Sequence, residues 1–131
     1  MNAFLVQLDN RPGSLAELAG ALAAGGVNIH AVAGAAIGGH GHFALATDDE
    51  PATRAALGAH GTDYSEVEIS EVTMPHEPGS LALATRRLAD AGINIDAILP
   101  LGMYGDQVTI GLVTSDPVTA KAILDGVWAP A

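Results

Sequence analysis

The sequence contains no cysteine. This absence excludes disulfides, thiolate metal sites and cysteine nucleophiles, and it is typical of a protein in a reducing compartment. Basic residues are also scarce, since 5 Lys and Arg stand against 15 Asp and Glu and give a formal net charge of −10. Such a chain repels nucleic acid and anionic membranes, so we expect neither as a partner.

Long apolar runs are missing as well. No stretch approaches the roughly 18 residues that suggest a membrane span. The N-terminal residues Met1–Phe4 lack the basic and apolar regions of a signal peptide. We therefore expect a cytoplasmic protein. The chain is instead rich in small and apolar residues, with 49% hydrophobic residues and 16 glycines, which is typical of a compact globular protein.

The dominant pattern in the sequence is a repeat. Asn10–Ala16 reads Asn-Arg-Pro-Gly-Ser-Leu-Ala, and His76–Ala82 reads His-Glu-Pro-Gly-Ser-Leu-Ala, 66 residues later. Each copy precedes an apolar helical run that ends in a Gly-hydrophobe-Asn-Ile turn, at 26–29 and 92–95. The pattern indicates a tandem duplication.

Two prolines, Pro51 and Pro117, extend the same spacing of 66 residues into the later part of each copy. We therefore expect two units, 1–68 and 69–131. A unit of this size is close to the smallest that holds a core by itself, so each is expected to gain from burial against another. For the same reason we expect a homodimer.

Each unit is expected to run strand, helix, strand, strand, helix, strand. Alternating apolar residues predict strands, and apolar residues spaced by three and four predict helices. In the first unit these lie at 3–9 (strand), 14–24 (helix), 27–37 and 42–47 (strands around a 38–41 loop) and 52–60 (helix). Ser14 to Glu17 has the spacing of a capping box, and Leu15, Leu18 and Leu22 form the apolar stripe of the first helix.

The second unit repeats the order. A long extended run at 63–74 predicts a last strand of the first unit that flows directly into the first strand of the second. A helix at 78–92, strands at 93–101 and 107–114 around a 102–105 turn, and a helix at 117–125 are expected to follow. Only 126–131 remain, so the last strand of this unit is expected to be short or missing. The element order predicts an α+β fold with helices on one face of an antiparallel sheet.

A family resemblance rests on these motifs. Asn-Arg-Pro-Gly-Ser-Leu with Gly-Val-Asn-Ile, and His-Glu-Pro-Gly-Ser-Leu with Gly-Ile-Asn-Ile, resemble the ACT domain, and the resemblance covers nearly the whole chain. It implies a ferredoxin-like βαββαβ sandwich, with two tandem ACT-like repeats packed side by side. It also implies an allosteric regulatory module that binds amino acids where two such units meet.

The Pro-Gly turns are the expected ligand sites. A turn that enters a helix leaves backbone N–H groups unpaired at the positive end of the helix dipole, which suits a carboxylate. Glycine admits a ligand close to the backbone, and asparagine amides offer acceptors for an ammonium group. The resemblance implies contacts at the turn and at the asparagine that opens the second strand. The expected set is Asn10, Arg11, Pro12, Gly13, Asn28, His76, Gly79 and Asn94.

The two sites are not chemically equal, because His76 stands where Asn10 stands in the first copy. A metal site is the first alternative. His40 and His42 are two apart on an expected strand and can share one face, but Asp106 and Val108 hold the matching places in the second copy and no third ligand is evident.

The second alternative is a structural interaction domain without a ligand. No catalytic set emerges, because Ser14 and Ser80 are expected to act as helix caps and no His-Asp arrangement recurs near both. We expect a protein that is not an enzyme and holds no cofactor. It is expected to bind a small amino acid or related carboxylate and to pass its signal to an unidentified effector protein.

Overall fold

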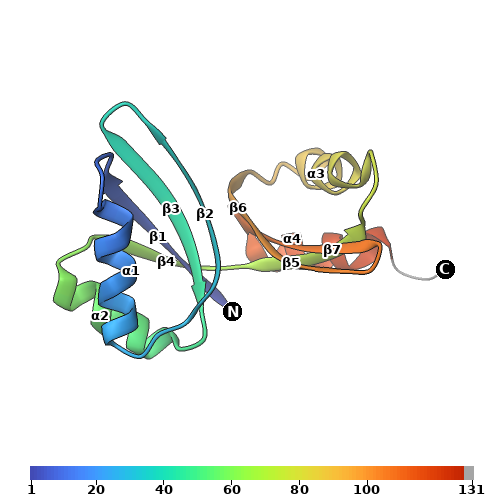
Figure 1. The fold of residues 1–131 in the computed structure, drawn as a ribbon. Helices are drawn as coiled ribbons and strands as arrows, with labels where there is room; N and C mark the ends of the chain where they lie inside the picture. Colours follow the sequence, from blue (N-terminus) through green and yellow to red (C-terminus); the bar gives the residue numbers. More distant parts are fainter. Residues whose placement is uncertain (129–131) are drawn as a thin grey trace. The chain divides into compact units, whose positions relative to one another are not determined.

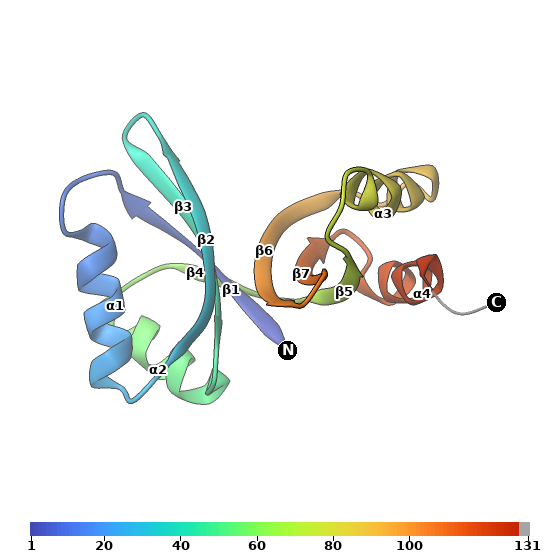
Figure 2. The ribbon, with the colours of Figure 1, turned by 45° about the vertical axis from the view of Figure 1, so that its right-hand side comes forward.

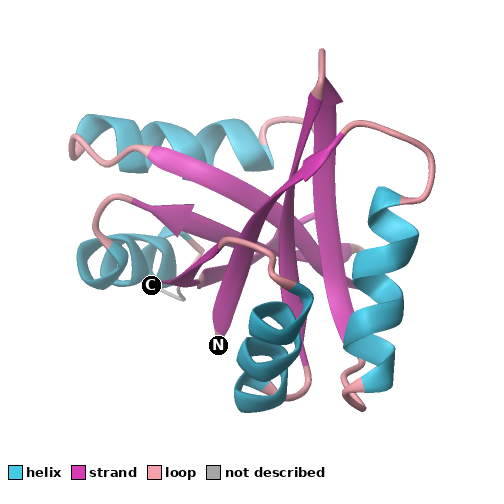
Figure 3. Ribbon diagram, turned by 90° about the vertical axis from the view of Figure 1, so that its left-hand side faces the viewer, coloured by secondary structure: helices cyan, strands magenta, loops and turns pink. Residues whose placement is uncertain are grey.

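The computed structural model describes residues 1–128 of the 131-residue chain (Figure 1). The chain divides into two compact units, one spanning Met1–Val67 and the other beginning at Glu68. Both are α+β, with two helices packed against one sheet, as Figure 3 shows. None of the helices formed by residues 1–128 is long and apolar enough to cross a membrane.

The first unit has the strand order of a ferredoxin-like sandwich. Its four-stranded sheet runs β2-β3-β1-β4, with β1 and β2 both antiparallel to β3. Both helices lie on one face of the sheet (Figure 2). The elements are β1 (Asn2–Asp9), α1 (Ser14–Ala24), β2 (Ile29–Ile37), β3 (His40–Thr47), α2 (Glu50–His60) and β4 (Tyr64–Glu68).

The core of the first unit lies between this sheet and its helices. It is formed by Phe4, Val6, Leu18, Leu22, Val27, Leu45 and Leu57. Each fully buried leucine stabilises the fold by about 1.5–3 kcal/mol. The predicted stripe of α1 is only partly correct, because Leu18 and Leu22 are buried whereas Leu15 is 42% exposed.

The second unit has the same layout with a three-stranded sheet in the order β5-β7-β6. Its core consists of Val72, Met74, Ala84, Leu88, Ile93, Ile110, Leu112, Ala120 and Leu124. The elements are β5 (Ser70–Pro75), α3 (Ser80–Asp90), β6 (Ile95–Tyr104), β7 (Gln107–Thr114) and α4 (Pro117–Val127).

The place that β4 takes beside β1 has no counterpart beside β5 within residues 1–128. The last strand was expected to be short or missing at 126–131. Residues 126 and 127 belong to α4, and 129–131 lie outside the described residues.

The α+β, ferredoxin-like fold predicted from the sequence is therefore confirmed. The long run at 63–74 is two strands in direct succession, β4 and β5, separated by Ile69. The predicted helix at 78–92 was placed too early, because it begins at Ser80. Gly79 precedes it with φ of 93°, a left-handed conformation that does not continue into an α-helix.

Both hairpin loops are shorter than predicted. The first turn is Gly38-Gly39, so His40 already belongs to β3. The second turn is Gly105-Asp106, and β6 continues through Tyr104. Gly38 and Gly105 have φ of 63° and 62°. Each turn is thus built on a glycine in the left-handed conformation, which lets the flanking strands pair up to the tip.

The period of 66 residues does not hold throughout. In β6, Pro100 pairs with Ile110 and Gly102 pairs with Thr109, so Leu101 is an extra residue at a bulge. Beyond this point the two units align with an offset of 67. The matching spacing of Pro51 and Pro117 is therefore not a repeat position.

The helix caps show the same shift. Asp49 caps α2 and Asp116 caps α4 through their side chains, and these residues are 67 apart. Likewise His42 pairs with Gln7 and Thr109 pairs with Thr73. The counterparts of His40 and His42 are thus Gln107 and Thr109, and the sequence alignment to Asp106 and Val108 was wrong by one residue.

Candidate functional site

The first Pro-Gly turn is anchored to the β2–β3 hairpin. The Asn10 side-chain Nδ2 donates to the Gly38 carbonyl at 2.9 Å, and the Asn10 backbone N–H donates to the Gly39 carbonyl at 2.9 Å. The amide donor is thus used in holding the turn. The Asn10 Oδ1 keeps its capacity as an acceptor.

The N-terminus of α1 carries no side-chain cap. Gly13 occupies the cap position with φ of 92°, and Ser14 is already the first helical residue. The predicted capping box is therefore wrong, because a capping serine requires an extended backbone at the cap position itself. The same geometry recurs at Gly79 and Ser80, so the serines do not cap either helix.

The missing cap leaves donors at the end of α1 without an internal partner. The N–H of Ser14 donates to the Arg11 carbonyl at 3.3 Å and that of Glu17 donates to the Gly13 carbonyl at 2.8 Å. Within residues 1–128 no acceptor is found for the N–H groups of Leu15 and Ala16. These two donors, with the helix dipole behind them, can receive an anion.

Arg11 and Glu17 form an ion pair across the turn. Arg11 Nη2 lies 2.9 Å from Glu17 Oε2, and both side chains are 52% exposed. The hydrogen bond from Arg11 and its charge lower the pKa of Glu17, and the same contact raises the pKa of Arg11. A ligand carboxylate that approached Arg11 would have to displace Glu17.

A cavity of about 410 Å³ lies beside this turn. It is polar, and its carboxylates, histidines and arginine come from several elements of the first unit. The lining residues that carry charge or can do so are Asp9, Arg11, Glu17, His40, His60 and Asp63. Pro12 does not line the cavity, so of the predicted turn residues only Arg11 faces it.

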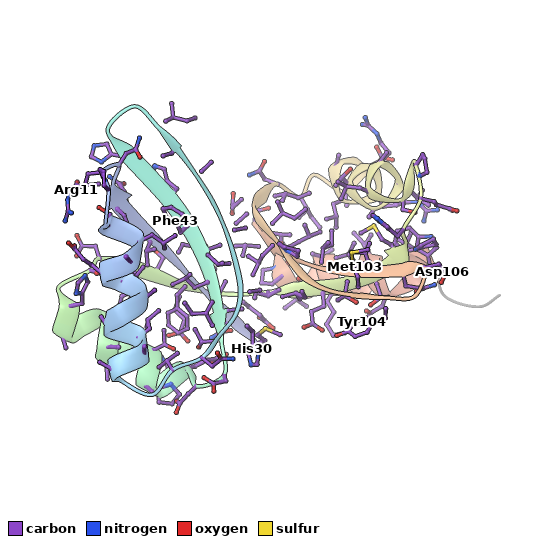
Figure 4. The ribbon with its side chains drawn as sticks, viewed as in Figure 1. Arg11, His30, Phe43, Met103, Tyr104 and Asp106 are labelled. Carbon is purple, nitrogen blue, oxygen red and sulfur yellow. The ribbon has the colours of Figure 1, made fainter. Side chains whose placement is uncertain are left out.

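Asn28 lies at the other end of the first unit. Its backbone N–H donates to Asp48 Oδ1 at 2.8 Å, just before β2 begins. The 11 residues of α1 separate it from the turn, a length of about 16 Å at 1.5 Å per residue. Figure 4 shows the same separation, with Arg11 and His30 at opposite ends of the unit. One unit does not bring Asn10 and Asn28 together.

The turn of the second unit is built in the same way with different side chains. The His76 backbone N–H donates to the Asp106 carbonyl at 2.7 Å, and Gly79 takes the cap position. Glu77 and Leu83 stand where Arg11 and Glu17 stand in the first unit. The second turn therefore has no ion pair across it.

Asn94 marks the far end of the second unit. Its backbone N–H donates to Ser115 Oγ at 3.0 Å, and its Nδ2 donates to Asp96 Oδ1 at 2.7 Å. A cavity of about 460 Å³ opens beside it, between α3 and the start of β6, and Arg86 lines this cavity. The sequence had shown Arg86 only as half of the lone basic pair, and its place beside Asn94 was missed because it depends on how α3 packs.

The histidine alternative gains no further ligand. His40 and His42 are both exposed on β3, opposite Asp9 and Gln7 on β1. Residues 1–128 contain no group of three His, Asp or Glu side chains placed to hold a metal ion.

No protein-family model matches the sequence. An aspartokinase of Corynebacterium efficiens is 42% identical over 52 residues, which are 40% of this chain and only 12% of the aspartokinase. A Bacteroides thetaiotaomicron protein of solved structure superposes with a TM-score of 0.80 at 19% identity, over 95% of this chain and 85% of that protein.

The ligand-free regulatory subunit of aspartate kinase from Thermus thermophilus superposes with a TM-score of 0.70 at 19% identity, over 96% of this chain and 88% of the subunit. The corresponding subunit from Thermus flavus gives 0.68 at 20% identity, over 96% and 88%. The chain therefore has the tandem ACT-type fold of these regulatory subunits.

Proposed function

We propose that this tandem ACT-fold chain is a regulatory module, not an enzyme, that binds an α-amino acid or a related small carboxylate. The observation that carries the proposal is the pair of uncapped helix N-termini. Gly13 and Gly79 hold the same left-handed conformation, with φ of 92° and 93°, in front of α1 and α3. Each leaves the helix end without the side-chain oxygen that usually fills it.

The proposed chemistry follows from this geometry. The ligand carboxylate accepts hydrogen bonds from the first-turn N–H groups, such as those of Leu15 and Ala16, and is favoured by the helix dipole. Arg11 adds a charged donor once the carboxylate displaces Glu17. The ligand ammonium requires an acceptor, which the Oδ1 of Asn10, Asn28 or Asn94 supplies.

The site is proposed to form between ACT-like units. Within one unit the turn and the asparagine are about 16 Å apart, the length of an 11-residue helix. A single amino acid does not span that distance. A ligand that uses both groups must take the turn from one unit and the asparagine from another, and a homodimer offers such pairs. A ligand that binds only the assembled form shifts the population towards it.

The output of the module is proposed to reach a separate effector protein in the cytoplasm. The two Thermus proteins of the same fold are regulatory subunits of aspartate kinase, and the matched relative is an aspartokinase. These names support a role in which amino-acid binding controls a partner enzyme. They do not identify the partner or the amino acid for this chain.

The direct test is a panel of the twenty L-amino acids against the purified chain, by thermal shift and then calorimetry. A ligand at 100 times its Kd adds about 2.7 kcal/mol to the free energy of unfolding, which is readily detected. We expect one or a few amino acids to stabilise the chain. Silence across the panel at millimolar concentration would overturn the amino-acid function and favour a structural interaction domain.

The proposed site residues are tested with the amino acid that the panel identifies. Asn28→Ala and Asn94→Ala should each weaken binding where their unit is used, and Asn10→Ala and His76→Ala should do the same at the turns. Gln107→Ala, an exposed change on β7 away from both sets, is the control. Unchanged affinity in all four site variants would show that the ligand binds elsewhere.

A further inference from the structure

The basic side chains of this acidic chain are used very unevenly. The chain has only five Lys and Arg residues. Three of them are engaged with carboxylates, in the pairs Arg11–Glu17, Arg54–Glu66 and Lys121–Asp125. Arg86 and Arg87 have no ion pair or hydrogen bond to any side chain in the part of the chain that the structure describes. Two adjacent cations on α3 thus remain without an acidic neighbour.

One of these two cations lines a groove. Arg86 reaches the cavity of about 460 Å³ between α3 and the start of β6, whereas Arg87 does not. Small-molecule sites typically have volumes of roughly 300–1,000 Å³. The groove is walled by the small and apolar residues Ala82, Ala89, Ile93 and Ile95, with Asn94 at one end. It combines an apolar wall with one cation and one amide.

The feature belongs to the second unit alone. In α1, Gly20 occupies the position that Arg86 occupies in α3, and Ala19 occupies that of Thr85. A side chain added at Gly20 would meet open space, so packing does not require the small residue there. The first unit therefore has an asparagine at this end but no cation beside it, although the space for one exists.

We propose that the α3–β6 groove of the second unit is a binding site for a small carboxylate, with Arg86 as the residue that holds the acid group. A guanidinium presents two parallel donors that match a carboxylate, and Arg86 has no internal acid to displace, in contrast to Arg11 with Glu17. The Asn94 Nδ2 is already donated to Asp96, which leaves Oδ1 as an acceptor for an ammonium group.

The inference deepens the proposed function. That the ligand is an α-amino acid rests on that function, whereas the groove as a carboxylate site rests on Arg86 and its surroundings. If both hold, the two units differ in how they read the acid group: the first through a turn, the second also through an arginine at the opposite end.

The test uses the full chain labelled with ¹⁵N, with the backbone amide signals of Asn94 and Ile95 as the reporter. The probes are acetate, the twenty L-amino acids, and glycinamide, which keeps the ammonium but lacks the carboxylate. We expect the carboxylates to shift these signals and glycinamide to leave them unchanged. Binding should weaken as salt is added, because a partly exposed charge pair is screened.

The matched variants are R86Q and R87Q, which make the same change of charge at adjacent exposed positions. R86Q is expected to weaken carboxylate binding about tenfold, the effect of one lost charge-assisted contact, and R87Q less than about twofold. R86K, which keeps the charge but not the paired donors, should fall between them. Amide spectra of the free variants that overlay on the wild type establish that each is folded.

The outcomes separate this inference from the proposed function. Shifts at Asn94 with acetate but with no amino acid support the groove and contradict the amino-acid function. Amino-acid shifts confined to the first turn, with R86Q indistinguishable from wild type, support the function and overturn the groove. Equal losses in R86Q and R87Q overturn it too, because they show attraction by general charge.

Discussion

The hydroxyl groups of Thr47 and Thr53 lie 2.7 Å apart and form a buried hydrogen bond in the first unit. The second unit keeps only half of this pair. Thr114 occupies the place of Thr47, but Ala120 occupies that of Thr53, and the Thr114 Oγ1 is buried without a partner within residues 1–128. A polar group in this state destabilises its unit, because it has lost water and gained nothing in return.

Thr114→Val should therefore stabilise the second unit. The change keeps the shape of the side chain and removes the unpaired hydroxyl, so we expect the free energy of unfolding to rise by about 1 kcal/mol. Urea unfolding followed by the fluorescence of Trp128, which packs on the core of this unit, measures it. The matched change Thr47→Val should lower the stability of the first unit by about 1 kcal/mol, since Thr53 loses a partner. A loss of stability in Thr114→Val would show that its hydroxyl has a partner after all.

Gly13→Ala and Gly79→Ala should each destabilise the chain by about 1–2 kcal/mol, the cost of a left-handed backbone for a residue with a Cβ. The cause is conformational, because a Cβ meets nothing within 4 Å at Gly79 and only ordinary contacts at Gly13. Gly20→Ala is the control within α1, where it should stabilise the helix by about 1 kcal/mol. Thermal unfolding of the three variants tests this. Equal effects at Gly20 and Gly79 would contradict the backbone explanation.

The stability of the first unit should depend on pH through Glu66. Hydrogen bonds from Arg54, then from Asn2, lower the pKa of Glu66 to about 2. A lowered pKa stabilises the folded chain while the carboxylate is charged. The contribution is complete above the unfolded value of about 4.3 and is lost as the pH falls towards 2.

The variant Glu66→Gln removes this titration. The difference in stability between wild type and variant should be largest above about pH 5 and should shrink as the pH falls to 2. Glu68→Gln, an exposed change at the end of the same strand, is the control. Circular dichroism during acid unfolding provides the measurement. A difference that stays constant with pH would refute the role of this carboxylate.

The ion pair at the first turn gives a prediction that depends on the proposed function. Glu17→Gln removes the acid that competes for Arg11, so carboxylate ligands should bind at this turn about two- to fivefold more tightly, the scale of an exposed ion pair. Glu77→Gln at the second turn is the matched change of charge. Calorimetry with the identified amino acid compares the two, and tighter binding in both variants would point to general charge instead.

The fold was readable from the sequence because local signals agreed with one another. Period-two and helical apolar patterns predicted the elements, and the repeated Pro-Gly and Asn motifs predicted the duplication. Boundaries failed where a single residue decided them. The bulge at Leu101 shifted the alignment of the later elements, since an extra residue inside a strand leaves no mark in its apolar pattern.

The site was predicted less completely than the fold. The turns and asparagines were identified as residues, and whether they bind a ligand stays a prediction. Their separation by the length of a helix was not foreseen, because both motifs border the same helix in sequence and lie at its opposite ends in space. The capping role given to Ser14 was wrong, because the left-handed Gly13 takes the cap position itself.

What the amino-acid sequence determined alone is the class of the molecule: an acidic α+β chain in two similar halves, each with a glycine where the backbone must turn left-handed before a helix. Those features depend on contacts within a few residues. Only the tertiary structure decided that the turn and the asparagine lie at opposite ends of each unit, that Thr114 faces Ala120, and that Arg86 lines a groove beside Asn94. Each depends on which helix face meets which strand, and that is set by the packing of side chains distant in the sequence.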